Sequence, residues 1–255
     1  MAVGEFVRSR FTESILHLRR MGHKKLKRFA EIRTFQNVLE YPENTAGKWS
    51  QLFKNNQPVI LELACGKGEY AIGLAQLHPN KNFIGVDIKG NRIWVGAKKA
   101  IENDLKNVAF LRTQIQMIDQ YFEKSEVDEI WITFPDPQLR NSRAGKRLTH
   151  PRFLRLYKKI LQPGAKIHLK TDSPDLYNFT KTVIDLYKLT LILDLADVHK
   201  NEAVTAELKI ITHYEKLDIA KSKTVFYLCF SLPDAIMDSD DLLDNALKKE
   251  GHENH

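Results

Sequence analysis

Two glycines separated by a single residue follow a short apolar run that begins at Val59. Gly66 and Gly68 permit a tight turn and let a ligand approach backbone N–H groups closely. The spacing Gly66-x-Gly68-x-x-Ala71 also satisfies the dinucleotide-binding pattern. Glu62 precedes the loop, and its carboxylate would repel a pyrophosphate but attract an ammonium, such as the one at the methionine end of S-adenosylmethionine. A tight turn that binds no ligand is the simpler alternative.

A second carboxylate, Asp87, ends the next apolar run, 21 residues after Gly66. A carboxylate at this place can accept hydrogen bonds from both hydroxyls of a ribose. S-adenosylmethionine and NAD both carry that ribose, so Asp87 predicts nucleoside binding without choosing between the two cofactors. The alternative is that Asp87 caps the helix that follows it.

The segment Phe134-Pro135-Asp136-Pro137 is the most distinctive local feature. Two prolines fix the backbone on either side of one carboxylate. The form is like the Asp/Asn-Pro-Pro-aromatic turn with which amino-group methyltransferases grip a target base. Asp172 follows the next apolar run, and we expect it either to face the same crevice as Asp136 or to cap a helix.

The elements that must position these residues alternate along the chain. Short apolar runs predict strands, and patterns typical of helices lie between most of them. The expected strands cover residues 59–63, 82–87, 108–113, 129–134, 165–171, 191–197 and 224–231, and the expected helices cover 70–77, 92–104, 153–161 and 175–187. The sequence therefore predicts an α/β, Rossmann-like fold with a doubly wound, mostly parallel sheet and an antiparallel edge strand. Ligands of such sheets bind at the carboxyl ends of the strands.

The composition excludes several classes of protein. The chain has 255 residues, 43% of them hydrophobic, which suffices for one large domain with a real core. Cys65 and Cys229 are too few for a disulfide framework or a multi-cysteine zinc site, which favours a reducing compartment, the cytoplasm. We expect no membrane span, because no apolar run approaches about 18 residues. We also expect no metal, because the histidines lack ligand spacing.

The charge is unevenly spread. The net charge is +7, yet residues 1–33 hold nine Lys or Arg against three Glu, and residues 138–159 hold eight with no acid. Such basic blocks are often solvated faces, but together they favour a phosphate backbone as partner. We therefore expect a basic N-terminal extension over 1–56, a catalytic domain over 57–232 and an acidic, disordered tail over 233–255.

The ordered set of motifs resembles the bacterial tRNA (guanine-N7)-methyltransferases. No single motif is decisive, but the order and spacing are specific over roughly residues 57–232. The resemblance implies a methyltransferase domain that uses S-adenosylmethionine and acts on guanosine 46 in the variable loop of tRNA. The motifs are Glu62-x-x-x-Gly-x-Gly, Gly85-Val86-Asp87, Phe-Pro-Asp-Pro, Lys146-Arg147-Leu148, Thr171-Asp172 and Thr212-x-x-Glu215.

The resemblance also implies roles for the cofactor-binding residues. Glu62, Asp87 and Asp136 match the acids of the family's cofactor pocket, and Gly66 and Gly68 form the loop after the first of them. Asp136 is also the family's proposed catalytic residue.

On the substrate side, Asp172, Thr212 and Glu215 match the family's guanosine-binding positions. Arg140 stands where the family usually has Lys, and it keeps a charge that can hold a phosphate through two hydrogen bonds. This is one of several departures from the family pattern.

Other departures change the chemistry of single positions. Gln114 stands where the family usually has Asp after the third strand, and it can still hydrogen-bond the edge of an adenine. Gln138 replaces a Trp and removes an aromatic platform. Arg143 stands near the place of a family His. These changes bear on the grip on tRNA more than on the reaction.

The chemistry of the implied target fits the carboxylates. Guanine N7 carries an in-plane lone pair and no proton, so its methylation needs no strong base. The product ring is cationic, so the enzyme needs alignment and negative charge near the guanine. We expect Asp136 to be the main group, with Asp172 and Glu215 assisting.

Three alternatives stay open on the sequence alone. The first is a methyltransferase of the same fold that acts on another RNA, a protein or a small molecule. The second is an NAD-linked oxidoreductase, which the glycine pattern permits. The third is a non-catalytic RNA-binding protein on this scaffold. The sequence does not reveal the oligomeric state.

Overall fold

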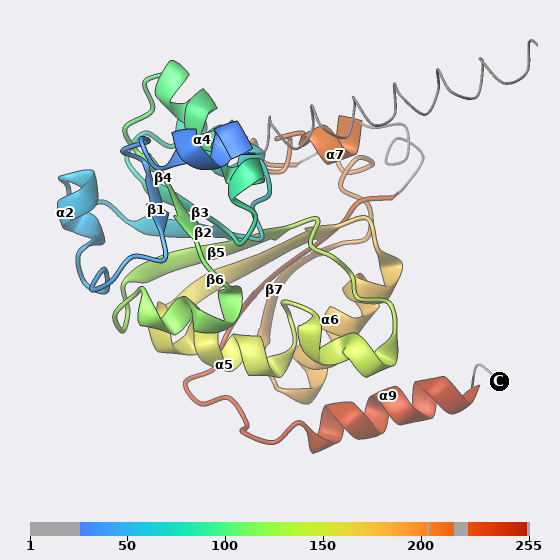
Figure 1. Cartoon of the computed structure of the whole chain (residues 1–255). Coiled ribbons are helices and arrows are strands. Elements are labelled where there is room, and N and C mark those ends of the chain that lie inside the picture. The colour runs from blue at the N-terminus through green and yellow to red at the C-terminus, as the bar shows by residue number, and fades with distance from the viewer. Residues whose placement is uncertain (1–25, 203, 217–223, 254–255) are drawn as a thin grey trace, which may run out of the picture.

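The computed structural model describes residues 26–202, 204–216 and 224–253. Within these residues, eight strands form one sheet in the order β1-β4-β3-β2-β5-β6-β8-β7 (Figure 1). The neighbours from β1 to β6 are parallel, and β8 is antiparallel to both β6 and β7. The strands are β1 (Val38–Glu40), β2 (Val59–Leu63), β3 (Asn82–Asp87), β4 (Val108–Arg112), β5 (Val127–Thr133), β6 (Leu161–Thr171), β7 (Thr190–Leu195) and β8 (Phe226–Ser231).

Helices connect the parallel strands, as the alternating pattern predicts. The observed bounds differ from the expected ones by one or two residues for most elements, and the predicted fold class is confirmed. The helices are α2 (Trp49–Phe53), α3 (Glu69–Leu77), α4 (Gly90–Glu102), α5 (Pro151–Ile160), α6 (Pro174–Leu186), α7 (His213–Lys216) and α9 (Asp241–Glu253), with the 3-10 helices η1 (Ile115–Gln120) and η2 (Asn141–Lys146).

The helices cover both faces of the sheet, which buries the central strands completely. Every residue of β2 and β3 is buried. One apolar cluster lies between the sheet and helices α5 and α6, and another lies between the sheet and helices α3 and α4 (Figure 1). This two-sided burial explains why these strands read as uninterrupted apolar runs.

The antiparallel addition lies at one edge of the sheet, as the sequence predicts. The antiparallel strand itself, β8, sits one place in from the edge, between β6 and the edge strand β7. Because β8 enters between two strands, Phe226–Ser231 is mostly buried, whereas the first four residues of β7 are exposed.

The expected N-terminal extension differs from the structure in its second part. Val38–Glu40 forms β1, which pairs in parallel with β4 at one edge of the sheet. Trp49 is 1% exposed, and its indole Nε1 donates to the carbonyl of Tyr121 at 2.8 Å. The domain therefore begins well before residue 57. The basic run of residues 1–25 lies outside the described residues.

The acidic tail is folded over much of its length, so the expectation of disorder is wrong there. Leu243 of α9 is fully buried, and Leu247 packs against the same apolar cluster. Arg155 of α5 also holds the tail, through the carbonyl of Met237 and through Asp240 Oδ1 at 2.8 Å. The acids mark the solvent side of an amphipathic helix rather than a chain without a core face.

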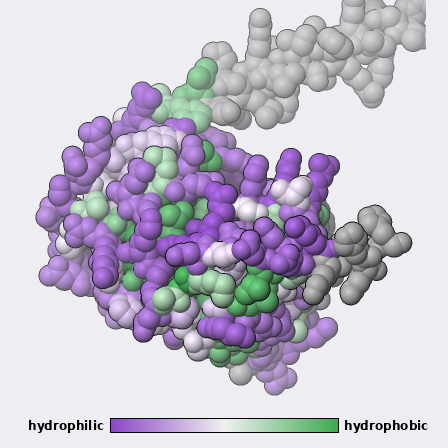
Figure 2. Space-filling model, turned by 90° about the horizontal axis from the view of Figure 1, so that it is seen from below, coloured by the Kyte–Doolittle hydropathy of each residue, from purple (hydrophilic) through white to green (hydrophobic). Residues whose placement is uncertain are grey.

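The surface seen from below is largely hydrophilic, with apolar side chains visible in patches between the charged ones (Figure 2). Among the described residues, no helix is long and apolar enough to cross a membrane. The same residues contain no group of three or more His, Cys, Asp or Glu side chains that could hold a metal ion.

The packing of α9 predicts unequal effects at two adjacent leucines. We expect Leu243→Ala to lower the free energy of unfolding by about 2–5 kcal/mol, because it opens a cavity under α9. Leu242 is 45% exposed, and Leu242→Ala should stay within about 0.5 kcal/mol of the parent. Urea denaturation of both variants measures the difference. Equal midpoints would show that α9 does not contribute to the core.

Candidate active site

A cavity opens at the carboxyl ends of β2 and β5, against the loop that contains the two glycines. Ala64, Gly66 and Gly68 all adopt the left-handed backbone region, with φ of 57°, 55° and 64°. A Cβ at Gly66 would meet no atom within 4 Å, whereas one at Gly68 would lie 2.3 Å from the ring of Phe110. Gly68 is therefore required by packing, and the backbone at Gly66 faces open space.

The lining of this first cavity combines charges of both signs with aromatic and hydroxyl groups. Glu62 and Glu69 supply carboxylates, and Lys67 and Arg92 supply cations. This set fits the free amino-acid end of a ligand, which carries one ammonium and one carboxylate. The full lining is Glu62, Ala64, Cys65, Gly66, Lys67, Glu69, Tyr70, Arg92, Thr133, Phe134, Thr212, His213 and Tyr214.

Glu62 is buried beneath this cavity and is held at both oxygens. Oε2 accepts the N–H of Ala71 at 2.8 Å, and Oε1 accepts the hydroxyl of Thr133 at 2.9 Å. Burial is the largest influence on the carboxyl group and raises its pKa to about 8. A positively charged ligand beside Glu62 would favour the ionised form, which burial otherwise disfavours.

Asp87 fixes the glycine loop in place. Its Oδ2 accepts the N–H of Gly66 at 2.9 Å, and its Oδ1 accepts the N–H of Lys89 at 2.7 Å. Asp87 is 7% exposed and lies behind the loop rather than among the residues that line the cavity. Gln114 is exposed just before η1 and does not line the cavity either.

A second cavity adjoins the first and shares Phe134 and Tyr214 with it. It contains the carboxylates of Asp136, Asp172 and Asp175. These acids and the neighbouring aromatic rings suit a flat, hydrogen-bond-donating base. The full lining is Phe134, Pro135, Asp136, Pro137, Leu139, Asp172, Ser173, Pro174, Asp175, Tyr214, Thr224 and Phe226.

The turn that carries Asp136 is constrained at several points. Phe134 has a φ of 46°, a left-handed conformation that non-glycine residues adopt at a cost. Its N–H donates to the carbonyl of Lys170 at 2.8 Å. Asp136 is exposed to the cavity, and its Oδ1 accepts the N–H of Gln138 at 3.1 Å. The carboxylate is therefore presented on a rigid support.

A buried arginine holds the outer half of this turn. Arg147 is 3% exposed, and its guanidinium donates to the carbonyls of Pro137, Gln138 and Leu139 at 3.2–3.3 Å. The same guanidinium lies 4.4 Å from the ring centroid of Phe179. The basic block thus contains a structural cation that its charge pattern alone does not distinguish from a phosphate ligand.

The opposite wall is formed by the segment that leads into α7. Thr212 and Glu215 form a reciprocal cap: the N–H of Thr212 donates to Glu215 Oε2 at 2.9 Å, and the N–H of Glu215 donates to Thr212 Oγ1 at 3.2 Å. Glu215 Oε1 forms a buried ion pair with Lys170 Nζ at 2.9 Å. Thr212 lines the first cavity, whereas Glu215 lines neither and braces the wall.

The structure thus brings most, but not all, of the expected site residues together. Glu62, Gly66 and Thr212 meet at the first cavity, and Asp136 and Asp172 meet at the second, whereas Gly68 belongs to the same loop but does not line the cavity. Arg140 is exposed at the start of η2 and does not line the second cavity. Sequence reasoning overlooked the roles of Lys170, Arg147 and Tyr214. A charged residue inside an apolar strand was the available signal for Lys170.

Similarity to a known family shows that the chain is a methyltransferase. A family model described as "Putative methyltransferase" matches residues 56–228. A 16S rRNA methyltransferase, KamB, superposes with a TM-score of 0.56 over 75% of this chain and 96% of its own, at 16% identity. A SAM-dependent methyltransferase from Aquifex aeolicus superposes with a TM-score of 0.50 over 73% of this chain and 88% of its own, at 14% identity. At these identities the structural likeness shows the fold.

Relatives with similar sequences show to which family of methyltransferases the chain belongs. A tRNA (guanine-N(7)-)-methyltransferase of Porphyromonas gingivalis is 46% identical and is aligned over 78% of this chain and 86% of its own. The enzyme of the same name from Christiangramia forsetii is 45% identical, over 83% of this chain and 100% of its own. The one from Bacteroides thetaiotaomicron is 42% identical, over 84% of this chain and 87% of its own. The chain belongs to the tRNA (guanine-N(7)-)-methyltransferase family.

The raised pKa of Glu62 predicts that cofactor binding depends on pH. Because the pKa is about 8, the carboxyl is mostly protonated at neutral pH, and a cationic ligand must displace its proton. Affinity for S-adenosylmethionine should therefore rise by up to about tenfold per pH unit between about pH 6 and 7.

Calorimetric titration in buffers of different ionisation enthalpy measures this coupling. Wild type should release close to one proton per cofactor bound near neutral pH, and Glu62→Gln should release much less. Binding without proton release in the wild type would contradict the assignment of Glu62.

Proposed function

We propose that this chain methylates N7 of a guanosine in tRNA, at position 46 of the variable loop, with Asp136 as the principal catalytic residue. The observation that carries the proposal is the pair of adjoining cavities that share Phe134 and Tyr214. One has the charges that suit the amino-acid end of the cofactor, and the other has the acids and rings that suit a purine. The relatives' printed activity supports the same reaction.

The residues of the second cavity supply what the reaction needs. S-adenosylmethionine provides the methyl group, and the N7 lone pair of guanine accepts it, so no residue has to remove a proton. The guanine ring becomes cationic, and Asp136 and Asp172 lie in the cavity that would hold it. Both carboxylates can accept hydrogen bonds from the guanine N–H groups and stabilise the developing charge.

The surface beside this cavity supports tRNA as the substrate. Arg140, Arg143 and Lys146 are exposed in and next to η2, directly after the turn that carries Asp136. These three cations are available for phosphate contacts, unlike the buried Arg147. We further propose the cytoplasm as the site of the reaction, which the buried free thiols of Cys65 and Cys229 support.

Methyl transfer from labelled S-adenosylmethionine to tRNA that lacks 7-methylguanosine tests the proposal. We expect label at a single variable-loop guanosine, located by chemical cleavage at the modified base. If the protein binds the cofactor and no label enters tRNA, the proposed acceptor is wrong.

The same assay predicts the effect of Asp136→Asn. We expect kcat to fall by roughly a hundredfold, because the neutral amide no longer stabilises the cationic ring. The matched control is Asp238→Asn, because Asp238 is also exposed and lines neither cavity. A fully active Asp136→Asn variant would remove Asp136 from the mechanism.

A further inference from the structure

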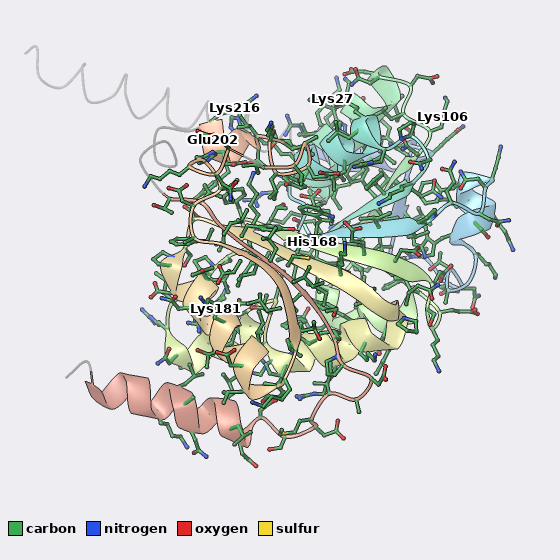
Figure 3. All side chains as sticks on the ribbon, turned by 180° about the vertical axis from the view of Figure 1, so that it is seen from behind. Lys27, Lys106, His168, Lys181, Glu202 and Lys216 are labelled. Atoms are coloured by element: carbon green, nitrogen blue, oxygen red, sulfur yellow. The ribbon has the colours of Figure 1, made fainter. Side chains whose placement is uncertain are left out.

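Tyr214 occupies the boundary between the two cavities. It is the second residue of α7, and it lines both cavities. Its side chain is partly open to solvent, with 40% of the residue exposed, so a ligand can reach the ring. Figure 3 shows α7, whose last residue Lys216 is labelled, at the rim of the molecule, whereas His168 lies inside on the sheet.

The ring of Tyr214 is held in position at both ends. Its hydroxyl donates to Asp172 Oδ2 at 3.1 Å, so the phenol is tied to a carboxylate of the second cavity. Its ring packs against Phe134 with the centroids 5.6 Å apart and the planes inclined by 41°. Phe134 is itself fixed by the hydrogen bond to Lys170. The ring therefore has little freedom to turn away.

The short helix that carries Tyr214 is also tied to two separate elements, α3 and β6, and to Asp172, the residue that follows β6. The N–H of His213 donates to Glu69 Oε2 of α3 at 2.7 Å, across the mouth of the first cavity. Glu215 pairs with the buried Lys170 of β6, and Asp172, just after β6, accepts the hydrogen bond of the tyrosine hydroxyl. Because a four-residue helix is not stable on its own, these contacts hold α7 in place.

We propose that Tyr214 is a catalytic residue whose ring face contacts the target guanine and stabilises the positive charge that methylation creates. The inference rests on the proposed function. An aromatic face attracts a cation more than a neutral group. Guanine is neutral before the transfer and cationic after it, so the contact strengthens along the reaction and lowers the barrier.

Three variants separate the ring from the hydroxyl. Tyr214→Leu removes the aromatic face, and we expect kcat to fall by roughly tenfold or more while KM for tRNA changes less. Tyr214→Phe keeps the face and loses the hydroxyl that bonds to Asp172, so kcat should stay within about threefold. Tyr41→Leu is the control, because Tyr41 is a similarly exposed tyrosine, at 46%, outside both cavities.

A binding measurement distinguishes charge stabilisation from a structural role. Each variant is titrated with tRNA that carries 7-methylguanosine and with the same tRNA without it. The wild-type preference for the methylated form should fall several-fold in Tyr214→Leu and persist in Tyr214→Phe and Tyr41→Leu. Thermal melting and cofactor titration confirm that each variant is folded.

Two results would overturn the inference. A Tyr214→Leu variant with wild-type kcat and an unchanged preference for methylated tRNA would exclude a role for the ring, with the proposed function intact. A wild-type protein that binds cofactor but forms no 7-methylguanosine would overturn the proposed function and this role together.

Discussion

A single buried lysine joins the two walls of the candidate active site. Lys170 is fully buried in β6, and its Nζ donates to the carbonyls of Leu208 and Ile210 at 3.2 and 3.0 Å. The same ammonium pairs with Glu215 at 2.9 Å, while its backbone carbonyl accepts the N–H of Phe134. Burial lowers the pKa of Lys170, and the charge of Glu215 opposes that effect. One residue thus orders the turn before Asp136 and the segment before α7.

The basic side chains of residues 138–159 differ in burial and therefore in what they contact. Arg147 holds three carbonyls of the catalytic turn from inside the protein. Arg155 and Lys158 face acids of the C-terminal tail, at 2.8 and 4.0 Å. Arg140 and Arg143 remain exposed beside the second cavity. Net charge predicts a polyanionic partner, but only the environment of each cation shows which side chains are exposed and can contact a phosphate.

The sequence predicts the central part of the fold closely, because strands buried on both faces read as continuous apolar runs. The bounds of β2 and β3 are as expected, and Glu62, Gly66, Asp136 and Asp172 at or after strand ends line two adjoining cavities. Local sequence patterns do not predict the elements whose structure depends on tertiary contacts. Strand β1 has only three residues and depends on β4, and α9 is an acidic segment whose few leucines find a core.

In the site, too, the roles that depend on tertiary contacts could not be predicted from local sequence patterns. The resemblance matches Thr212 and Glu215 to guanosine-binding positions. In the structure the two residues cap each other, and Glu215 also pairs with Lys170, which lies 45 residues earlier in the chain. No local pattern reveals that partner. Tyr214, between them, carried no signal of its own, because its significance comes from lying where two cavities meet.

Hydrogen exchange of Lys170→Met, followed by mass spectrometry, tests the role of this lysine most directly. Peptides that cover 208–216 should exchange much faster than in the wild type, because the substitution removes the ammonium that binds Leu208, Ile210 and Glu215. The peptide that covers 134–139 should change less, because Phe134 donates to the backbone carbonyl of residue 170, which methionine keeps. Peptides that cover β2 and β3, buried at every position, should keep their protection. Unchanged exchange in 208–216 would contradict the account, because the wall of the site would then be held by other contacts.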